Sequence, residues 1–349
     1  MKQVTVPFFI SHQGCPHTCV FCDQRTISGS NGALPTVDQI LAMVELWRST
    51  AGGRPLEVAF FGGTFTALPE ETQSELLAPL QPLLKSGALA SVRISTRPDY
   101  IDSGRVEWLA LRGVRTIELG VQSTDDNVLA ASGRGHFASD SLAAIRCIKN
   151  SGLRAGAQLM PGLPGDTPAS SLSSLEQVIA AGADFLRIYP TVVLQGTELA
   201  RLYTAGEFIP LSLERGLALC TLLLHRAMQA GIPVIRIGLQ AENGLDDGSV
   251  LAGCRHPALG QLVRSRLFAD LLNHVVSPGG SVTVYCHSAR TSDVVGMKLA
   301  NLQEQAARGV QMQVLPDDSL SKEELRIQGA DSTNLYSIIS DNHYSIGEV

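Results

Sequence analysis

The chain has 349 residues, of which 44% are hydrophobic and 17% charged, and its formal net charge is -6. A chain of this size and apolar content can bury a large core, and we expect one large domain and a smaller one. No apolar run approaches the roughly 18 residues that span a bilayer, so no membrane segment is expected. The negative net charge argues against indiscriminate binding to polyanions.

Short β-branched or aliphatic runs recur along the first two thirds of the chain and predict strands. These runs are residues 4–10, 56–61, 91–95, 116–121, 154–160, 185–189 and 234–239. Segments with helical periodicity or helix start signals lie between them, at residues 37–48, 69–84, 102–111, 139–150, 167–180 and 213–230. The alternation predicts an α/β fold: a partial (β/α)6 barrel of the TIM type, followed by a small α+β C-terminal domain.

The predicted barrel covers residues 1–240, and an accessory domain covers residues 241–330. In the accessory domain we expect strands at residues 281–286 and 310–315, with one helix at residues 292–308 between them. Residues 331–349 are a polar tail that is expected to be loosely ordered. Polar residues follow the barrel strands at their carboxyl ends, where the active sites of parallel barrels lie.

Three cysteines, Cys15, Cys19 and Cys22, lie within eight residues directly after the first predicted strand. Thiolates at this density hold a metal or exchange disulfides. Three ligands leave one coordination position of a cluster or ion free, and a substrate or cofactor can bind there.

Two other interpretations compete with a cluster. A structural zinc site would recruit His12 or His17, but such sites usually pair two short Cys/His spacings, and no second Cys-x-x-Cys is present. A disulfide framework fits less well, because seven cysteines are sparse for a stapled secreted scaffold and no signal peptide precedes the first strand. A cytoplasmic location is therefore expected.

The spacing Cys-x-x-x-Cys-x-x-Cys, with Phe21 before the last cysteine, resembles the signature of radical S-adenosylmethionine (SAM) enzymes. The resemblance implies a [4Fe-4S] cluster on Cys15, Cys19 and Cys22, whose fourth iron chelates SAM. In that family one electron from the cluster cleaves SAM to methionine and a 5'-deoxyadenosyl radical, while the protein supplies position and excludes water. The implied partner is an electron donor such as flavodoxin or ferredoxin.

Further motifs extend the resemblance. The pair Gly62-Gly63 is similar to the family's glycine motif, although a tight turn alone also explains it. Gln122 and Arg134 lie in runs that resemble oxygen-independent coproporphyrinogen oxidases and the radical domain of the Elongator catalytic subunit; ordinary packing and capping are the alternative. The implied cofactor-binding residues are Phe21, Gly62, Gly63, Thr64, Ser95, Gln122, Arg134, Gln158 and Tyr189.

The resemblance covers roughly residues 4–240 and, through residues 95–100 and 188–197, favours the Elongator-type family. Ser95 stands where that family usually has Glu, and Gln158 stands where the porphyrinogen oxidases have Asp. These changes put contacts to the cofactor's ribose and amino group in doubt, although a hydroxyl and an amide can still form single hydrogen bonds. The acetyltransferase domain of the Elongator subunit has no counterpart motif here, so acetyl transfer is not implied.

The C-terminal third has a different charge balance. Residues 251–313 carry six basic and three acidic residues, a local charge of +3 in an acidic chain. Residues 293–302 resemble the centre of a KH-type RNA-binding fold, with Leu299 where its Gly-x-x-Gly loop has the second glycine. An accessory domain that only packs on the barrel is the alternative to RNA binding through residues 251–315.

The sequence thus predicts a radical SAM enzyme that abstracts hydrogen from a substrate, with a nucleoside in RNA as the leading hypothesis. A tetrapyrrole or other small molecule is one alternative, and a non-catalytic RNA-binding or redox-sensing iron-sulfur protein is another. Cys254 lies beside Arg255 and His256, conditions that lower a thiol pKa, so a reactive thiol is one interpretation, but packing is the preferred one.

Overall fold

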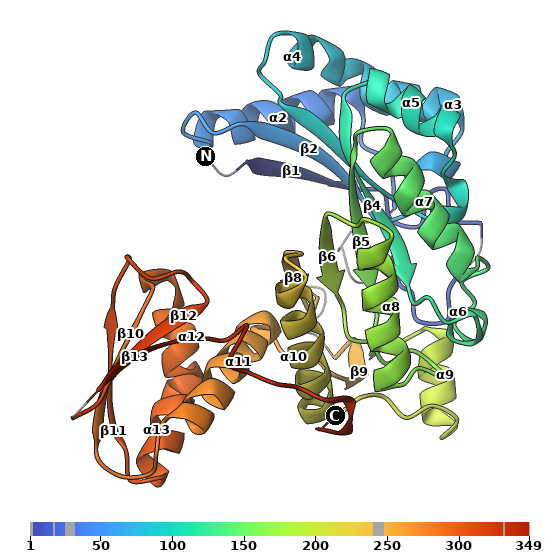
Figure 1. Ribbon diagram of the computed structural model, residues 1–349. Helices are drawn as coiled ribbons and strands as arrows, with labels where there is room; N and C mark the ends of the chain where they lie inside the picture. The colour runs from blue at the N-terminus through green and yellow to red at the C-terminus, as the bar shows by residue number, and fades with distance from the viewer. Residues whose placement is uncertain (1–2, 17, 25–31, 240–247, 331, 349) are drawn as a thin grey trace.

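Seven parallel strands form one curved sheet in the computed structural model, which describes residues 3–16, 18–24, 32–239, 248–330 and 332–348 (Figure 1). The strand order is β1 (Val4–Phe9), β2 (Leu56–Phe61), β3 (Ser91–Thr96), β4 (Val114–Gln122), β5 (Arg154–Leu159), β6 (Phe185–Ile188) and β8 (Val234–Ile237). The sheet curls into a half-barrel with β1 and β8 as its edges. The predicted partial TIM-type barrel is confirmed.

Helices cover the outer face of this sheet, as expected for strands joined by right-handed crossovers. They are α2 (Val37–Thr50), α3 (Glu70–Leu77), α4 (Gln81–Lys85), α5 (Ser103–Leu111), α7 (Ala138–Asn150), α8 (Pro168–Ala180) and α10 (Leu213–Gln229). The short helices α6 (Asp126–Ala131) and α9 (Glu198–Thr204) instead pack against the loop that follows β1. The single helix expected at residues 69–84 is divided into α3, a 3-10 turn and α4. Pro79 and Pro82 lie at this division, and neither can donate the backbone hydrogen bond of a helix interior.

A two-stranded antiparallel ribbon lies beside the barrel sheet. It pairs β7 (Val192–Leu194) with β9 (Val250–Gly253). The chain therefore returns to the barrel after residue 248, while the domain boundary that we expected near residue 240 falls on residues 240–247, outside the described part. None of the described helices is long and apolar enough to cross a membrane.

The C-terminal module contains a four-stranded sheet in the order β11 (Gln311–Pro316), β10 (Ser281–Cys286), β12 (Glu324–Gln328) and β13 (Thr333–Ser337). Its helices are α11 (Leu259–Val275), α12 (Thr291–Val295) and α13 (Ala300–Ala307), and Figure 1 shows α10 and α11 between this sheet and the barrel. The expectation of one helix at residues 292–308 is wrong. Gly296, Lys298 and Leu299 have φ values of 82°, 53° and 66°, which interrupt the helix between α12 and α13.

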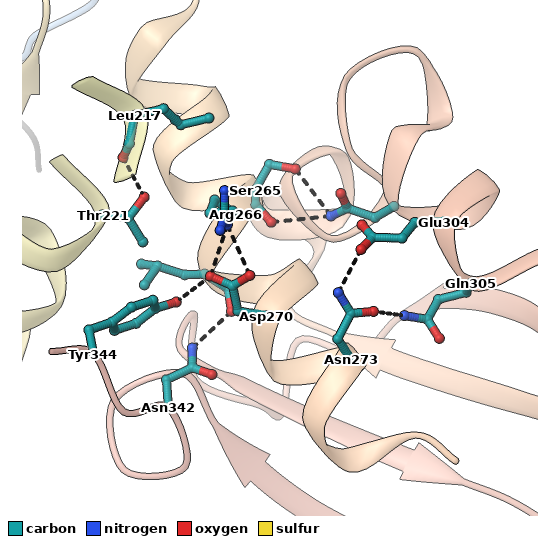
Figure 2. Close-up of polar contacts among 12 residues, drawn as sticks. Leu217, Thr221, Ser265, Arg266, Asp270, Asn273, Glu304, Gln305, Asn342 and Tyr344 are labelled. Atoms are coloured by element: carbon teal, nitrogen blue, oxygen red, sulfur yellow. Dashed lines mark hydrogen bonds and ion pairs between the residues drawn. The ribbon is translucent and has the colours of Figure 1, made fainter. Parts of the chain in front are cut away.

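The expectation of a loosely ordered tail is also wrong. Thr333–Ser337 pairs with β12 in antiparallel register, and the chain then returns to α11. Figure 2 shows Tyr344 and Asn342 beside α11, and the Tyr344 hydroxyl donates to Asp270 Oδ2 at 2.8 Å. Asn342 Nδ2 donates to the backbone carbonyl of Leu267 at 2.9 Å. The tail is therefore ordered and packs against helix α11 of the same module.

Asn301 ties the interrupted helix to α11. Its side-chain amide nitrogen lies 3.0 Å from the carbonyl oxygen of Val294 and 3.1 Å from Ser265 Oγ, and the residue is 6% exposed. A Cβ on Gly296 would lie 2.8 Å from the Asn301 backbone nitrogen. The close packing of Asn301 therefore requires a glycine at the helix break.

We predict that Asn301→Ala lowers the free energy of unfolding by about 1–3 kcal/mol, because buried groups lose their hydrogen-bond partner. Asn334→Ala, at an exposed position of β13, is the control and should be near neutral. Urea denaturation followed by circular dichroism measures both changes. Equal stability of the two variants would contradict a structural role for Asn301.

Candidate functional site

A cavity of about 350 Å³ opens at the carboxyl ends of the barrel strands. Its lining includes every site residue expected from the sequence: Cys15, Cys19, Phe21, Cys22, Gly62, Gly63, Thr64, Ser95, Gln122, Arg134, Gln158 and Tyr189. Parallel strands all end at the same edge, so residues far apart in sequence meet there. The fold thus brings the predicted residues together around one space.

The three cysteines lie on the loop that follows β1, and neighbouring elements hold this loop on both sides. The Val20 backbone N–H donates to the carbonyl of Ser132 at 3.1 Å, and the Leu199 N–H donates to the carbonyl of Val20 at 2.7 Å. Cys15 Sγ lies 3.4 Å from Thr64 Oγ1. The thiols are therefore positioned by α6, α9 and the turn after β2.

The cysteine loop and the turn after β2 meet backbone to backbone. The Thr64 N–H donates to the carbonyl of Gln13 at 2.7 Å. Gly63 has a φ of 59°, and a Cβ there would overlap the carbonyl oxygens of Gln13 and Ile10. A Cβ on Gly14, whose φ is 72°, would overlap the carbonyl oxygen of Thr64. Two glycines thus permit the contact, one on each side.

Gln24 reinforces this contact and was missed in the sequence analysis. Its side-chain oxygen accepts from the His12 N–H at 2.7 Å and from the Gly63 N–H at 2.6 Å. Its own N–H donates to His12 Nε2 at 2.9 Å. The Gly63 N–H is therefore occupied by the protein, so any ligand contact by Gly63 falls to its carbonyl group. A glutamine after a cysteine motif carries no sequence signal for this role.

Burial changes the acidity of the thiols. It raises the pKa of Cys15, partly offset by Thr64, and it raises the pKa of Cys22 to about 12 with help from Cys19 and Cys15. Three thiolates cannot gather in this environment without positive charge, which the iron ions of a cluster supply. The soft sulfur donors, their mutual repulsion and the glycine-lined turn together fit an iron-sulfur cluster.

Arg134 links the cysteine loop to β4. Its Nη1 donates to Cys19 Sγ at 3.3 Å, and its Nη2 donates to the carbonyl of Gly120 at 2.5 Å. A Cβ on Gly120 would lie 2.8 Å from the side-chain amide nitrogen of Gln122. The glycine therefore leaves room for the side chains of Gln122 and Arg134. His136, two residues after Arg134, is kept neutral: burial, then Arg134 and Arg97, lower its pKa to about 3.

Gln122 adopts a left-handed backbone conformation, with a φ of 69°. Its side-chain oxygen accepts from Gln158 Nε2 at 3.1 Å. Non-glycine residues in this region cost free energy and concentrate at functional sites. The amide pair presents polar groups to the cavity where Gln158 replaces a carboxylate of the porphyrinogen oxidases, and Ser95 lines the same space.

The geometry bears on the zinc interpretation. His12 Nε2 accepts the Gln24 hydrogen bond and lies 3.9 Å from Asp23 Oδ1, while His17 lies outside the described residues. No three His, Cys, Asp or Glu side chains are placed to share one metal ion anywhere in the described part of the chain. Thiolate ligands of a cluster bind separate iron atoms and need not meet at one point.

A charged network extends from the inner part of the barrel to this cavity, and sequence reasoning missed it. Arg93 contacts Glu57 at 2.7 Å and Glu118 at 2.6 Å. Arg187 Nη2 donates to Glu118 Oε1 at 3.1 Å, and Arg187 Nη1 donates to the Tyr189 hydroxyl at 2.9 Å. Burial opposes the charge of Arg187, but Glu118 and Tyr189 outweigh it and raise the pKa of Arg187.

Cys254 packs against α10. It is 2% exposed, and a Cβ on Gly216 would overlap its sulfur. Burial raises the pKa of Cys254 to about 11, the opposite of the change that makes a thiol reactive. The structure therefore favours packing over reactivity at this position.

We predict that Gly63→Ala prevents most iron incorporation on anaerobic reconstitution, because the added Cβ displaces the cysteine loop. Gly52→Ala is a matched control: Gly52 has a φ of 60°, but a Cβ added there would meet no atom within 4 Å. It should lose only the roughly 1–2 kcal/mol of left-handed strain. Iron and sulfide analysis measures the difference, and normal iron content in Gly63→Ala would contradict the contact.

Comparisons with known proteins agree with this site. Residues 9–177 match the Radical SAM superfamily, and residues 183–269 match the Radical_SAM C-terminal domain. The tRNA uridine(34) acetyltransferase of Methanocaldococcus jannaschii is 27% identical over 247 residues, which are 59% of this chain and 45% of that protein. Elongator complex protein 3 of Bos taurus is 29% identical over 174 residues, 44% of this chain and 32% of that protein.

Among solved structures, Methanocaldococcus infernus Elp3 with an N-terminal deletion has a TM-score of 0.61 at 23% identity. The match covers 76% of this chain and 62% of that one, and the two share the fold. The chain spans less than half the length of the two curated relatives described above. The two family matches together span more than half of the chain. The chain therefore belongs to the radical SAM superfamily, and it is similar in sequence to Elongator-type proteins.

Proposed function

We propose that Cys15, Cys19 and Cys22 hold a [4Fe-4S] cluster and that SAM binds beside it in the same cavity. The observation that carries this proposal is the single cavity lined by the three thiols and by all the residues expected to contact SAM. When bound, the cluster and SAM supply reductive cleavage for hydrogen abstraction from a substrate. A one-electron donor such as flavodoxin or ferredoxin is the proposed source of the electron.

The chain's own residues would position SAM and exclude water. Arg134 offers a planar guanidinium next to the cysteine loop, suited to a carboxylate or to ribose hydroxyls. Gln122 and Gln158 offer amide groups, Ser95 a hydroxyl, and the turn at Gly62 and Gly63 a close backbone approach. Phe21 and Tyr189, together with Thr64, complete the proposed cofactor wall.

For the substrate, we propose a nucleoside in RNA. The relatives named as tRNA uridine(34) acetyltransferases support RNA as the substrate class. The match covers less than half of each of these relatives, so we do not propose acetyl transfer for this chain. The C-terminal module supplies the second support, since its interrupted helix gives a loop of the kind that KH domains use to clamp a nucleic-acid backbone.

Positive charge exceeds negative charge in and around this loop, Gly296 to Leu299. Arg264 and Arg290 both lie 3.2 Å from the same oxygen of Asp293, so one carboxylate serves two cations. Lys298 is exposed, and no described residue pairs with it. Lys298 and Leu299 also hold left-handed backbone conformations, which cost free energy and mark functional segments.

The cofactor proposal predicts that anaerobically reconstituted protein contains about four irons per chain and releases 5'-deoxyadenosine from SAM after reduction. Gln122→Asn should keep its iron and bind SAM roughly tenfold more weakly, because asparagine tolerates the left-handed backbone but its amide is one methylene shorter. Equilibrium dialysis with labelled SAM measures binding. Stoichiometric zinc without cluster formation would defeat the proposal, and loss of iron in Gln122→Asn would make Gln122 a folding residue.

The RNA proposal predicts that Lys298→Glu weakens binding to tRNA and lowers the salt dependence of binding by about one counterion. Lys85→Glu on α4, an exposed lysine far from the module in Figure 1, makes the same charge change and should have a much smaller effect. Filter binding at several salt concentrations measures both slopes. Equal retention of wild type and Lys298→Glu, or no retention of cellular RNA at all, would point to a small-molecule substrate instead.

A further inference from the structure

The cavity is lined by a second group of side chains besides the proposed cofactor residues. This group includes Phe9, Phe61, Glu118, Arg187 and Arg236, contributed by β1, β2, β4, β6 and β8. The proposed cofactor contacts use none of these five side chains. They form a wall that combines two aromatic rings, one carboxylate and two guanidinium groups, and we call it the inner wall.

Glu118 and Arg187 of the inner wall belong to a network of ion pairs in which positive and negative charges are equal in number. Glu57 and Glu118 are paired with Arg93 and Arg187, so two carboxylates meet two guanidinium groups within one connected network. The side chains of Glu57 and Glu118 are only 3% and 7% exposed. A closed network of this kind needs no further ion.

Arg236 lies outside this balance. It is the direct register neighbour of Arg187 across the β6–β8 pair, and both residues line the cavity. No described residue forms a hydrogen bond or ion pair with Arg236. Two adjacent guanidinium groups, one of them without a counter-ion among the described residues, cost free energy in a partly buried site unless an anion joins them. The position therefore suits an anionic group of a ligand.

The two aromatic rings narrow the choice of ligand. Phe9 and Phe61 pack with ring centroids 6.1 Å apart, and the Arg187 guanidinium carbon lies 5.4 Å from the Phe61 ring centroid. Aromatic faces and arginine planes are the groups on which nucleic-acid bases stack. An apolar aromatic surface beside a free guanidinium matches a nucleotide, which has a flat base and a phosphate, better than it matches a simple carboxylate.

We propose that Arg236, supported by Arg187, binds a phosphate of the nucleotide that the enzyme acts on, while Phe9 and Phe61 form the apolar part of its site. This proposal rests on the proposed function and names the part of the substrate that is recognised. The planar fork of arginine can donate two hydrogen bonds to one phosphate, whereas lysine acts as a point charge. Glu118 holds the Arg187 guanidinium in place through contacts to its Nη2 and Nε atoms.

The test compares uridine 5'-monophosphate with uridine as probes, using anaerobic protein loaded with cluster and SAM. Isothermal titration of the wild type should show the monophosphate binding roughly ten- to hundredfold more tightly, as expected for charge-assisted hydrogen bonds to phosphate. Arg236→Gln should abolish this preference, and Arg236→Lys should keep part of it. Arg226→Gln, at a half-buried arginine that pairs with Glu176 on the outer helices, should retain the full preference.

Each outcome decides the proposal. Equal binding of both probes by the wild type, or a preference that survives Arg236→Gln while the iron content is normal, overturns the phosphate site. Filter binding of tRNA separates this result from the proposed function. If the monophosphate preference depends on Arg236 but no RNA is bound, the phosphate site stands and the substrate is a free nucleotide. If RNA is bound and modified equally by wild type and Arg236→Gln, the RNA function stands and the phosphate site fails.

Discussion

The contact between the cysteine loop and the turn after β2 determines the position of every other part of the site. Gly14 and Gly63 lack a Cβ at the two points where one would overlap the opposite backbone, and Gln24 joins both strands of the contact through one amide oxygen. Because β1 and β2 are register neighbours in a parallel sheet, this contact fixes the thiols against the carboxyl edge of the barrel. A shift there would move the thiols relative to all the residues on the later strands.

The barrel then divides the cavity into two chemical environments. In the first, burial raises the pKa values of Cys15 and Cys22, so the thiols require positive charge to ionise together, and Arg134 contacts Cys19. In the second, Arg236 is the one charged side chain of the inner wall that has no partner among the described residues. The proposed cofactor residues and the proposed anion site line one cavity, so a cofactor and a charged substrate would share one space, as hydrogen abstraction requires.

Local patterns were sufficient to predict the barrel but not its charged interior. The run at residues 91–95 is strand Ser91–Thr96, because Val92 and Ile94 alternate with Arg93 at the period of a strand. Glu57 interrupts such a run, and its partner Arg93 depends on register between β2 and β3, which the sequence does not show. Helix α11 follows Ala258 without a side-chain cap, so the sequence offered no start signal for this helix. Strand β13 has exposed side chains such as Asn334, so the sequence offered no apolar pattern for this strand. Gly296 did mark the helix break that we overlooked.

The central claim is that radical chemistry in this cavity acts on a nucleoside within RNA. The most direct measurement uses tRNA transcribed with deuterated ribose and base in one nucleotide type at a time, and records the mass of the 5'-deoxyadenosine released from SAM. We expect deuterium transfer into 5'-deoxyadenosine with one of the labelled nucleotides and none with the others. Release of unlabelled 5'-deoxyadenosine with every labelled RNA, at the rate seen without RNA, would contradict this claim.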